Sequence, residues 1–270
     1  MKSMLIKTAS FLPALRAWVS SKARVLSWFL RTGTRKVKAP FRNIVFRVRV
    51  AGRRRFSSSR TAQPATVKIT SLSDIVVNFI SLESRIDRRS ELLPEFSRMG
   101  LAHATHFVAL KRENGALGCA ESHHAVLEQF GESERLLMVC EDDISFRLSA
   151  EQLLVVVQRF AEDPLLDVLQ LDIRTRSKLH DHNELFKLTN NSNSAGCYVV
   201  KPYAVRVMRS YFRESVLRLR KGQPDRRAAI DVVWTEAQQR KLVFATPAQR
   251  VVIHKSGHSD IVGSYMKLDT

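Results

Sequence analysis

The stretch Arg135-Leu136-Leu137-Met138-Val139-Cys140-Glu141-Asp142-Asp143-Ile144 decides how the rest of the chain is organised. Its apolar half is typical of a buried β-strand. Three carboxylates follow at once, and three adjacent acids repel one another unless a cation lies among them. Ligands bind at strand ends in open α/β sheets. The stretch therefore predicts a divalent-metal site that holds a phosphorylated ligand, with a solvated acidic turn as the alternative.

The charge of the chain is distributed very unevenly. Its 270 residues have a net charge of +18, with 44 basic and 26 acidic side chains. Residues 1–66 contain 16 of the basic side chains and no acidic one, which leaves 28 basic and 26 acidic residues for the remainder. We therefore predict two parts, a basic arm with a linker over 1–66 and one globular domain over 67–270.

The three cysteines, Cys119, Cys140 and Cys197, have no CxxC spacing. This pattern argues against a zinc site and against a disulfide framework, and it fits a reducing compartment.

The basic arm has a helical period over residues 14–31. Its cationic face holds Arg16, Ser20, Arg24, Ser27 and Arg31, and its apolar face holds Leu15, Trp18, Val19, Val25, Leu26 and Phe29. Charges interrupt every apolar run, so neither a spanning helix nor a cleavable signal is expected. A basic amphipathic helix followed by Arg53-Arg54-Arg55 predicts binding to an anionic membrane surface through residues 14–60. The alternatives are a nucleic-acid tail, an organellar transit peptide and a start codon assigned too early.

Strand and helix patterns alternate through the globular domain. Strands are expected at 74–82, 106–110, 136–140, 168–173, 186–189, 196–201 and 242–245. Helices are expected at 90–99, 118–130, 150–161, 202–212 and 229–240. The segments 186–189 and 196–201 are expected to pair around an Asn/Ser turn. This alternation predicts an α/β domain with a mostly parallel central sheet.

Several segments together resemble glycosyltransferase family 25, the lipooligosaccharide galactosyltransferase type. The segments that carry the resemblance, in chain order, are Val77-Asn78-Phe79-Ile80-Ser81-Leu82 with Arg85 and Arg88-Arg89, Gly115-Ala116-Leu117-Gly118-Cys119-Ala120-Glu121-Ser122-His123, Val139-Cys140-Glu141-Asp142-Asp143, Gly196-Cys197-Tyr198-Val199-Val200, and Ser259-Asp260-Ile261. The resemblance spans residues 74–261. It implies a GT-A-like nucleotide-sugar-binding fold, a UDP-linked donor and a divalent cation such as Mn²⁺.

Two positions depart from the family pattern. Ala116 stands where the family usually has Glu, and Asp231-Val232-Val233-Trp234 only loosely matches the family's Asp-aromatic segment. These departures bear on the activity and the substrate more than on the fold.

The acidic triplet supplies the candidate metal ligands. A metal held by one or two carboxylates neutralises the leaving diphosphate in sugar transfer. Asp142 and Asp143 are the predicted ligands, and Asp143 is the stronger candidate because adjacent strand residues point to opposite faces. Glu141 is a candidate for contact with the nucleotide sugar or for a catalytic role. His254 is a candidate for a third ligand.

Substrate-binding candidates come from the segments that match the family. They are Asn78, Ser81, Arg85, Arg88, Ser122, His123 and Asp260. Guanidinium groups just past the first strand suit bidentate binding of phosphate, with a salt-bridged solvated loop as the alternative. His123 is expected to contact donor or acceptor, or else to be a buried structural histidine.

An inverting transfer needs a base within hydrogen-bond reach of the acceptor hydroxyl. Asp231, at the start of a predicted helix, is the first candidate, with Glu236 behind it. The alternative for Asp231 is stabilisation of the helix N-terminus by its carboxylate.

The combined prediction is a metal-dependent glycosyltransferase that moves a hexose, galactose from UDP-galactose, onto a lipid-linked or other saccharide. It would act in the cytoplasm at the inner face of the cytoplasmic membrane, and nucleic acid is not the expected partner. The alternative is a non-catalytic saccharide- or nucleotide-binding module whose basic arm contacts membrane or nucleic acid. A two-metal phosphohydrolase would need a further ligand cluster, which no spacing supplies.

Overall fold

The computed structural model describes residues 43–52, 68–175, 179–259, 261 and 264–266. The chain divides into one unit that ends at Gly52 and a second that begins at Arg53. In the first unit, residues 43–52 form a helix. The predicted amphipathic segment 14–31 and the cluster Arg53-Arg54-Arg55 lie outside the described residues. Among the helices of the described ranges, none combines the length and the apolar character needed to cross a membrane.

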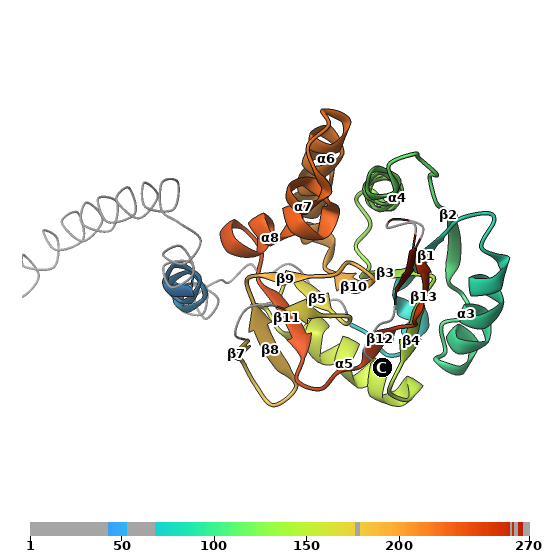
Figure 1. Ribbon diagram of the computed structural model, residues 1–270. Coiled ribbons are helices and arrows are strands. Elements are labelled where there is room, and N and C mark those ends of the chain that lie inside the picture. Colours follow the sequence, from blue (N-terminus) through green and yellow to red (C-terminus); the bar gives the residue numbers. More distant parts are fainter. Residues whose placement is uncertain (1–42, 53–67, 176–178, 260, 262–263, 267–270) are drawn as a thin grey trace, which may run out of the picture. The chain divides into compact units, whose positions relative to one another are not determined.

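The second unit is built on an eight-stranded sheet with the strand order β2-β1-β3-β10-β5-β11-β8-β7 (Figure 1). The strands are β1 (Val76–Ser81), β2 (Thr105–Val108), β3 (Leu137–Glu141), β5 (Val168–Gln170), β7 (His180–Asp181), β8 (Phe186–Thr189), β10 (Cys197–Val200) and β11 (Phe244–Pro247). Strand β1 pairs in parallel with β2 and β3, and β5 with β11. Only β10 and β8 run against the direction of the other strands of this sheet. The predicted mostly parallel α/β sheet is confirmed.

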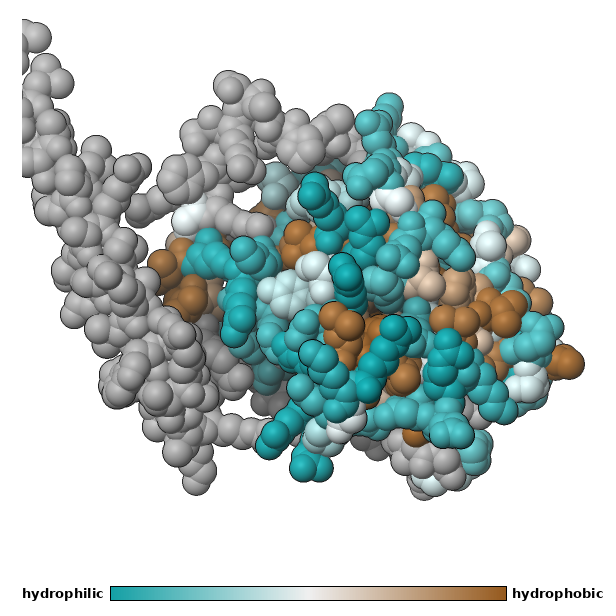
Figure 2. Space-filling view, turned by 90° about the horizontal axis from the view of Figure 1, so that it is seen from above, coloured by the Kyte–Doolittle hydropathy of each residue, from teal (hydrophilic) through white to brown (hydrophobic). Residues whose placement is uncertain are grey.

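Helices cover both faces of this sheet. They are η1 (Leu72–Asp74), α3 (Ile86–Arg98), α4 (Gly115–Phe130), α5 (Ala150–Glu162), α6 (Pro202–Arg220), α7 (Asp225–Ala228) and α8 (Ile230–Arg240). Helices α4, α6, α7 and α8 lie above the sheet in Figure 1, and α5 lies below it. Seen from above, the described surface of the molecule is mostly hydrophilic, with scattered apolar side chains (Figure 2). The upper helices are thus amphipathic, with their apolar sides directed at the sheet.

Local sequence signals explain where several helices begin. The Asn114 side chain accepts a hydrogen bond from the Leu117 amide at the start of α4. Ser149 and Gln152 form a reciprocal capping box at the start of α5. Pro202 occupies the first turn of α6, where its missing N–H costs nothing.

The upper core is apolar and rich in aromatic rings. Tyr198 from β10 meets Trp234 from α8 edge to face at 5.7 Å, and Trp234 meets Phe244 from β11 at 5.3 Å. All three side chains are fully buried. Edge-to-face pairs add about 0.5–1.5 kcal/mol each beyond the area they bury. This packing fixes α8 against the centre of the sheet.

Three short two-stranded ladders are also present among the described residues. They pair β4 (Ile144–Phe146) with β12 (Val252–His254), β6 (Arg174–Thr175) with β9 (Ser192–Asn193), and β13 (Gly257–Ser259) with β14 (Ser264–Met266). The first ladder sets His254 opposite Ile144. The Lys255 amide also donates to the Asp143 carbonyl at 2.7 Å. The C-terminal segment is therefore held beside the acidic triplet.

The structure corrects some of the expected elements. The predicted pairing of 186–189 with 196–201 is wrong, because β8 pairs with β7 and β11 whereas β10 pairs with β3 and β5. Hydrophobic patterns reveal strands but not their neighbours when both strands are buried. Helix α3 begins at Ile86 rather than at residue 90, and α6 continues to Arg220 rather than ending at 212.

Gly118 marks a close approach between α4 and the segment that follows β2. A Cβ atom at this position would lie 2.4 Å from the Leu110 carbonyl oxygen. Alanine in a helix interior normally gains about 1 kcal/mol over glycine, but a backbone oxygen cannot move away cheaply. We expect Gly118→Ala to lower the free energy of unfolding by about 1–3 kcal/mol in urea titrations.

Gly257→Ala is the matched control, because a Cβ atom there meets nothing within 4 Å. Equal stabilities of the two variants would contradict the close approach at Gly118.

Candidate functional site

A cavity opens at the carboxyl ends of β1 and β3, where the sequence predicts the ligand site. It is lined by Ile80, Ser81, Leu82, Arg88, Ala109, Leu110, Lys111, Arg112, Gly115, Gly118, Cys119, Ser122, His123, Glu141, Asp142, Asp143, Ser259 and Ile261. Because β1 and β3 are parallel neighbours, their carboxyl ends meet at one edge of the sheet. All three acids of the triplet line this cavity.

Asp142 is held by β1 and α3. Its carboxylate accepts hydrogen bonds from the Ser81 hydroxyl at 2.6 Å and from the Arg88 guanidinium at 2.7 Å. Burial raises the pKa of Asp142, against the lowering effect of Ser81 and Arg88. Both oxygens of Asp142 are therefore engaged by the protein itself.

Asp143 is joined to His254 and Asp172 in a buried ion triad. His254 Nδ1 lies 3.0 Å from Asp143 Oδ1, and His254 Nε2 lies 2.6 Å from Asp172 Oδ2. Burial acts to lower the pKa of His254, but the hydrogen bonds to the two carboxylates outweigh it and raise the pKa to about 10. The same contact lowers the pKa of Asp143, although burial opposes it. At neutral pH an imidazolium thus lies between two carboxylates.

The triad requires a glycine at position 196, just before β10. A Cβ atom at Gly196 would lie 2.4 Å from the His254 ring and 3.0 Å from Asp172 Oδ2. The Ser194 hydroxyl donates a further hydrogen bond to Asp172. The turn before β10 is therefore shaped around the His254 side chain.

One group of side chains has the donor set for a divalent cation. Ligand atoms of Glu141, Asp143 and His254 all lie within 4.8 Å of one another. Two carboxylates and one imidazole suit Mn²⁺ and similar ions, and ligation of an ion by His254 requires that its ring lose the proton it holds here. The structure thus brings together the predicted ligands Asp143 and His254. Glu141, rather than the predicted Asp142, completes this group.

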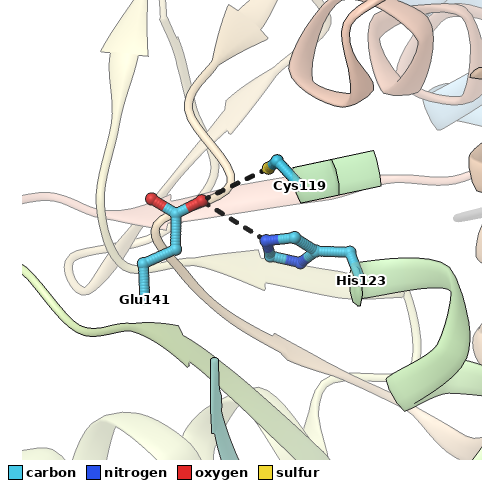
Figure 3. Close-up of side chains that lie close together, drawn as sticks. All are labelled: Cys119, His123 and Glu141. Carbon is cyan, nitrogen blue, oxygen red and sulfur yellow. Dashed lines mark hydrogen bonds and ion pairs between the residues drawn. The ribbon is translucent and has the colours of Figure 1, made fainter. Parts of the chain in front are cut away.

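Glu141 also faces α4 (Figure 3). Its Oε1 atom lies 3.7 Å from Cys119 Sγ and 3.3 Å from His123 Nε2. The other ring nitrogen of His123 lies 3.2 Å from the Tyr198 hydroxyl. His123 is fully buried, and its ring forms part of the cavity wall. Burial raises the pKa of the Cys119 thiol, and Glu141 and Asp231 add to this effect.

Of the predicted substrate-binding residues Ser81, Ser122 and Asn78, the two serines line the cavity and the asparagine does not. Ser81 lines the cavity but is bonded to Asp142. Ser122 also lines it, yet it accepts from the Leu110 amide and donates to the Gly118 carbonyl, so it joins α4 to the preceding segment. Asn78 lies in the middle of β1, between Thr105 and Val139, and does not line the cavity.

The arginines after β1 serve mostly as internal braces. Arg88 lines the cavity and bonds to Asp142, to Asp143 and to the His258 carbonyl. Arg85 pairs with Asp87 at 2.9 Å and contacts the same carbonyl at 3.3 Å. Arg89 donates to the carbonyls of Leu82 and Glu83. Of the three arginines, only Arg88 lines the cavity, where further basic side chains come from the segment between β2 and α4.

Lys111 and Arg112 are those further cations. Both line the cavity from the segment between β2 and α4. Arg112 pairs with the buried Glu121 at 2.7 Å. The Lys111 ammonium makes no ion pair with any residue that the structure describes, so it is available to an anionic ligand.

The remaining candidates come from the last third of the chain. Asp231 lies in the first turn of α8 and accepts from the Ser194 amide at 3.4 Å. Glu236 pairs with Arg218 at 2.6 Å and does not line the cavity. Asp260 lies outside the described residues, whereas its neighbours Ser259 and Ile261 line the cavity. Ala116 is buried in the apolar core, so the departure from the family pattern lies behind the cavity wall.

Sequence reasoning missed Asp172, Ser194, Lys111 and Tyr198 as parts of the site. Asp172 lies two residues after the buried strand β5, and an acid at the end of a buried strand is also the signal that marks the triplet at the end of β3. The contact of Asp172 with His254 joins residues 82 positions apart. No local pattern shows such a contact.

Comparisons with known proteins find only distant similarity. No family model matches the chain, and no curated protein matches it, so the resemblance to glycosyltransferase family 25 is not confirmed. One similar structure is a glycosyltransferase involved in the glycosylation of the major capsid of PBCV-1, with 11% identity over 63% of this chain and 92% of that one, and a TM-score of 0.32. Another is described as a glucose-1-phosphate thymidylyltransferase from Bacillus anthracis in complex with a sucrose, with 10% identity over 66% and 69%, and a TM-score of 0.34. Neither is close enough to assign a family.

The ion triad predicts a pH-dependent stability. The pKa of His254 rises from 6.5 to about 10 on folding. The native state therefore keeps a proton that the unfolded state releases between these values. The stabilisation is fully present below pH 6.5 and is lost as the pH rises through about 10, by an amount on the order of a few kcal/mol. Thermal unfolding with chelator present should show the loss, and His254→Gln should remove it.

His103→Gln is the control, because His103 is exposed and contacts only the Ile75 carbonyl, at 3.3 Å, among the described residues. A wild-type pH profile that matches the His254→Gln profile would refute the triad.

Proposed function

We propose that this protein is a glycosyltransferase that uses a nucleotide-sugar donor and a divalent cation. The observation that carries the proposal is the composition of one cavity. The cavity is lined by Glu141 and Asp143, two members of the cation group that His254 completes, and by the basic side chains Arg88 and Lys111. It lies at the edge where two parallel strands end. This combination suits a diphosphate, which needs both a metal and cationic donors.

The donor is a UDP-sugar, and Mn²⁺ is the cation. Bound at Glu141, Asp143 and His254, the cation would neutralise charge on the leaving diphosphate. Lys111 supplies an ammonium at the same cavity, and it forms no ion pair with the carboxylates of the described residues. Arg88 is held by Asp142 and Asp143, and it orients both acids. The resemblance described above favours UDP-galactose as the donor and a lipooligosaccharide-type or other saccharide as the acceptor.

An inverting transfer needs one further carboxylate as base. A carboxylate that ligates the cation is a poor proton acceptor. With Glu141 engaged by the cation, the base would be Asp231 in the first turn of α8, a residue that does not itself line the cavity. Without the cation at Glu141, the base is Glu141, which lines the cavity directly.

A second candidate function is a non-catalytic saccharide- or nucleotide-binding module. The observation that favours it is the His254 imidazolium, which already supplies a positive charge between Asp143 and Asp172. A donor could then bind through Arg88 and Lys111 without a cation. The two functions differ in whether binding depends on metal.

Calorimetry distinguishes the two functions. We expect UDP-galactose to bind the wild-type protein in the presence of Mn²⁺ and to bind at least about tenfold more weakly when Mn²⁺ is removed or Asp143 is changed to Asn. Either change removes the bridge that the cation forms between the Asp143 carboxylate and the diphosphate. Asp181→Asn is the matched control, since Asp181 is an exposed aspartate on β7.

Metal-independent binding that survives Asp143→Asn would establish the binding module instead. The absence of binding by any UDP-sugar would refute the glycosyltransferase and leave the binding module, with a free saccharide as its ligand.

The location proposed is the inner face of the cytoplasmic membrane, reached through the basic arm. Each Lys or Arg near an anionic surface contributes about 1 kcal/mol, and residues 1–60 contain 16 of them. We expect deletion of residues 1–60 to abolish sedimentation with vesicles that contain anionic lipid, while donor binding persists. Zwitterionic vesicles are the control, and unchanged sedimentation of the deleted protein would refute membrane binding through the arm.

A further inference from the structure

Cys119 and His123 present two metal-binding atoms on the same face of α4. They are four residues apart, so their side chains lie one above the other along the helix. Figure 3 shows the thiol and the imidazole directed at the same carboxylate oxygen of Glu141 at the end of β3. Two ligands at this helical spacing, completed by a third from another element, are a recurrent way of building a zinc site.

The distances fit a metal ion at the centre of this cluster. Zinc lies about 2.3 Å from sulfur and about 2.0–2.2 Å from nitrogen and oxygen, so its ligands in a tetrahedron are separated by about 3.3–3.7 Å. Glu141 Oε1 lies 3.7 Å from Cys119 Sγ and 3.3 Å from His123 Nε2. The three ligand atoms all lie within 4.8 Å of one another. Only small movements are needed to bind an ion.

The orientation of the His123 ring is fixed from behind. Its Nδ1 atom lies 3.2 Å from the Tyr198 hydroxyl, and the two rings stack at 5.9 Å. Phe212 packs edge-on against the same imidazole at 6.1 Å. Metal binding through Nε2 would place the ring proton on Nδ1, which can donate it to the Tyr198 hydroxyl, and the Nε2 lone pair would then face Glu141 and Cys119. Such an outer partner is what metal-bound histidines have in almost every known site.

One side of the cluster remains open. Cys119, His123 and Glu141 all line the cavity, so a fourth ligand position faces it. Three protein ligands with an open fourth position are the arrangement of zinc sites that bind water or substrate. The thiol sets this cluster apart from the neighbouring oxygen-rich group, because thiolate selects softer ions than Mn²⁺.

We propose that Cys119, His123 and Glu141 form a zinc-type transition-metal site, separate from the cation group of Glu141, Asp143 and His254 and sharing Glu141 with it. Binding releases the thiol proton to solvent. Because one carboxylate belongs to both groups, Zn²⁺ held by Cys119 draws Glu141 away from Mn²⁺. Zinc therefore antagonises any Mn²⁺-dependent binding at this cavity.

Co²⁺ tests the site in the full-length protein, because a thiolate bound to cobalt gives a near-ultraviolet charge-transfer band that carboxylate and imidazole ligands do not give. We expect the band to appear on titration of the wild-type protein and to vanish when Zn²⁺ is added in excess. In the presence of Mn²⁺ the band should need a higher cobalt concentration, because both ions use Glu141 and the antagonism between them is reciprocal. Cys119→Ser should abolish the band. Cys140→Ala, which removes a fully buried thiol on β3, should retain it.

Two further variants keep the test decisive if Cys119→Ser unfolds, which circular dichroism would show. His123→Gln should retain a band but raise the cobalt dissociation constant at least about tenfold, and Tyr198→Phe should raise it by about 10–100-fold. The proposal is overturned if wild-type protein gives no band, if the band survives Cys119→Ser, or if it depends on Cys140. None of these readouts requires a nucleotide sugar, so they stand apart from the test of the proposed function.

Discussion

The repulsion among Glu141, Asp142 and Asp143 at the end of a buried strand is the constraint on which the rest of this site depends. Three carboxylates in a row cannot all be ionised near a core without compensation. Each acid is compensated by different partners. Asp142 accepts hydrogen bonds from the Ser81 hydroxyl and the Arg88 guanidinium, and Asp143 pairs with the His254 imidazolium. Glu141 contacts the polar face of α4 through His123. Removing the partner of one acid would leave that carboxylate uncompensated beside the other two, and their repulsion would destabilise the site.

These partners reach the triplet because of the topology of the sheet. The parallel pairing of β1 with β3 places Ser81 and the start of α3 beside the acids. The reversed strand β10 brings Gly196 to the same edge, and the ladder between β12 and β4 returns the C-terminal segment with His254. Residues from four regions of the sequence therefore converge on one strand end. The partners that stabilise the charge cluster are distant from one another in the sequence, and the order of the strands brings them together.

Glu141 lies between two groups of potential metal ligands. On one side lie Asp143 and His254, which with Glu141 make an oxygen-rich group suited to a hard divalent ion. On the other side lie Cys119 and His123, which add sulfur and nitrogen and suit a softer ion. A single carboxylate shared by the two groups makes their occupancy interdependent. If both proposed sites bind metal, the identity of the available ion would influence which ligand the cavity holds.

The amino-acid sequence alone was enough to predict the α/β alternation, the central strand and the acidic triplet at its carboxyl end, because burial and strand periodicity depend on neighbouring residues. Its short motifs also identified Arg88 and His123 as substrate-binding candidates and Asp143 as a candidate metal ligand. The tertiary structure alone decided that β10 lies between β3 and β5, that Glu141 replaces Asp142 in the cation group, and that Cys119 faces a carboxylate rather than only the core. The contacts of His254 with Asp143 and Asp172 span 111 and 82 residues. Local pattern cannot reveal such contacts, because they depend on strand order and on long-range charge compensation.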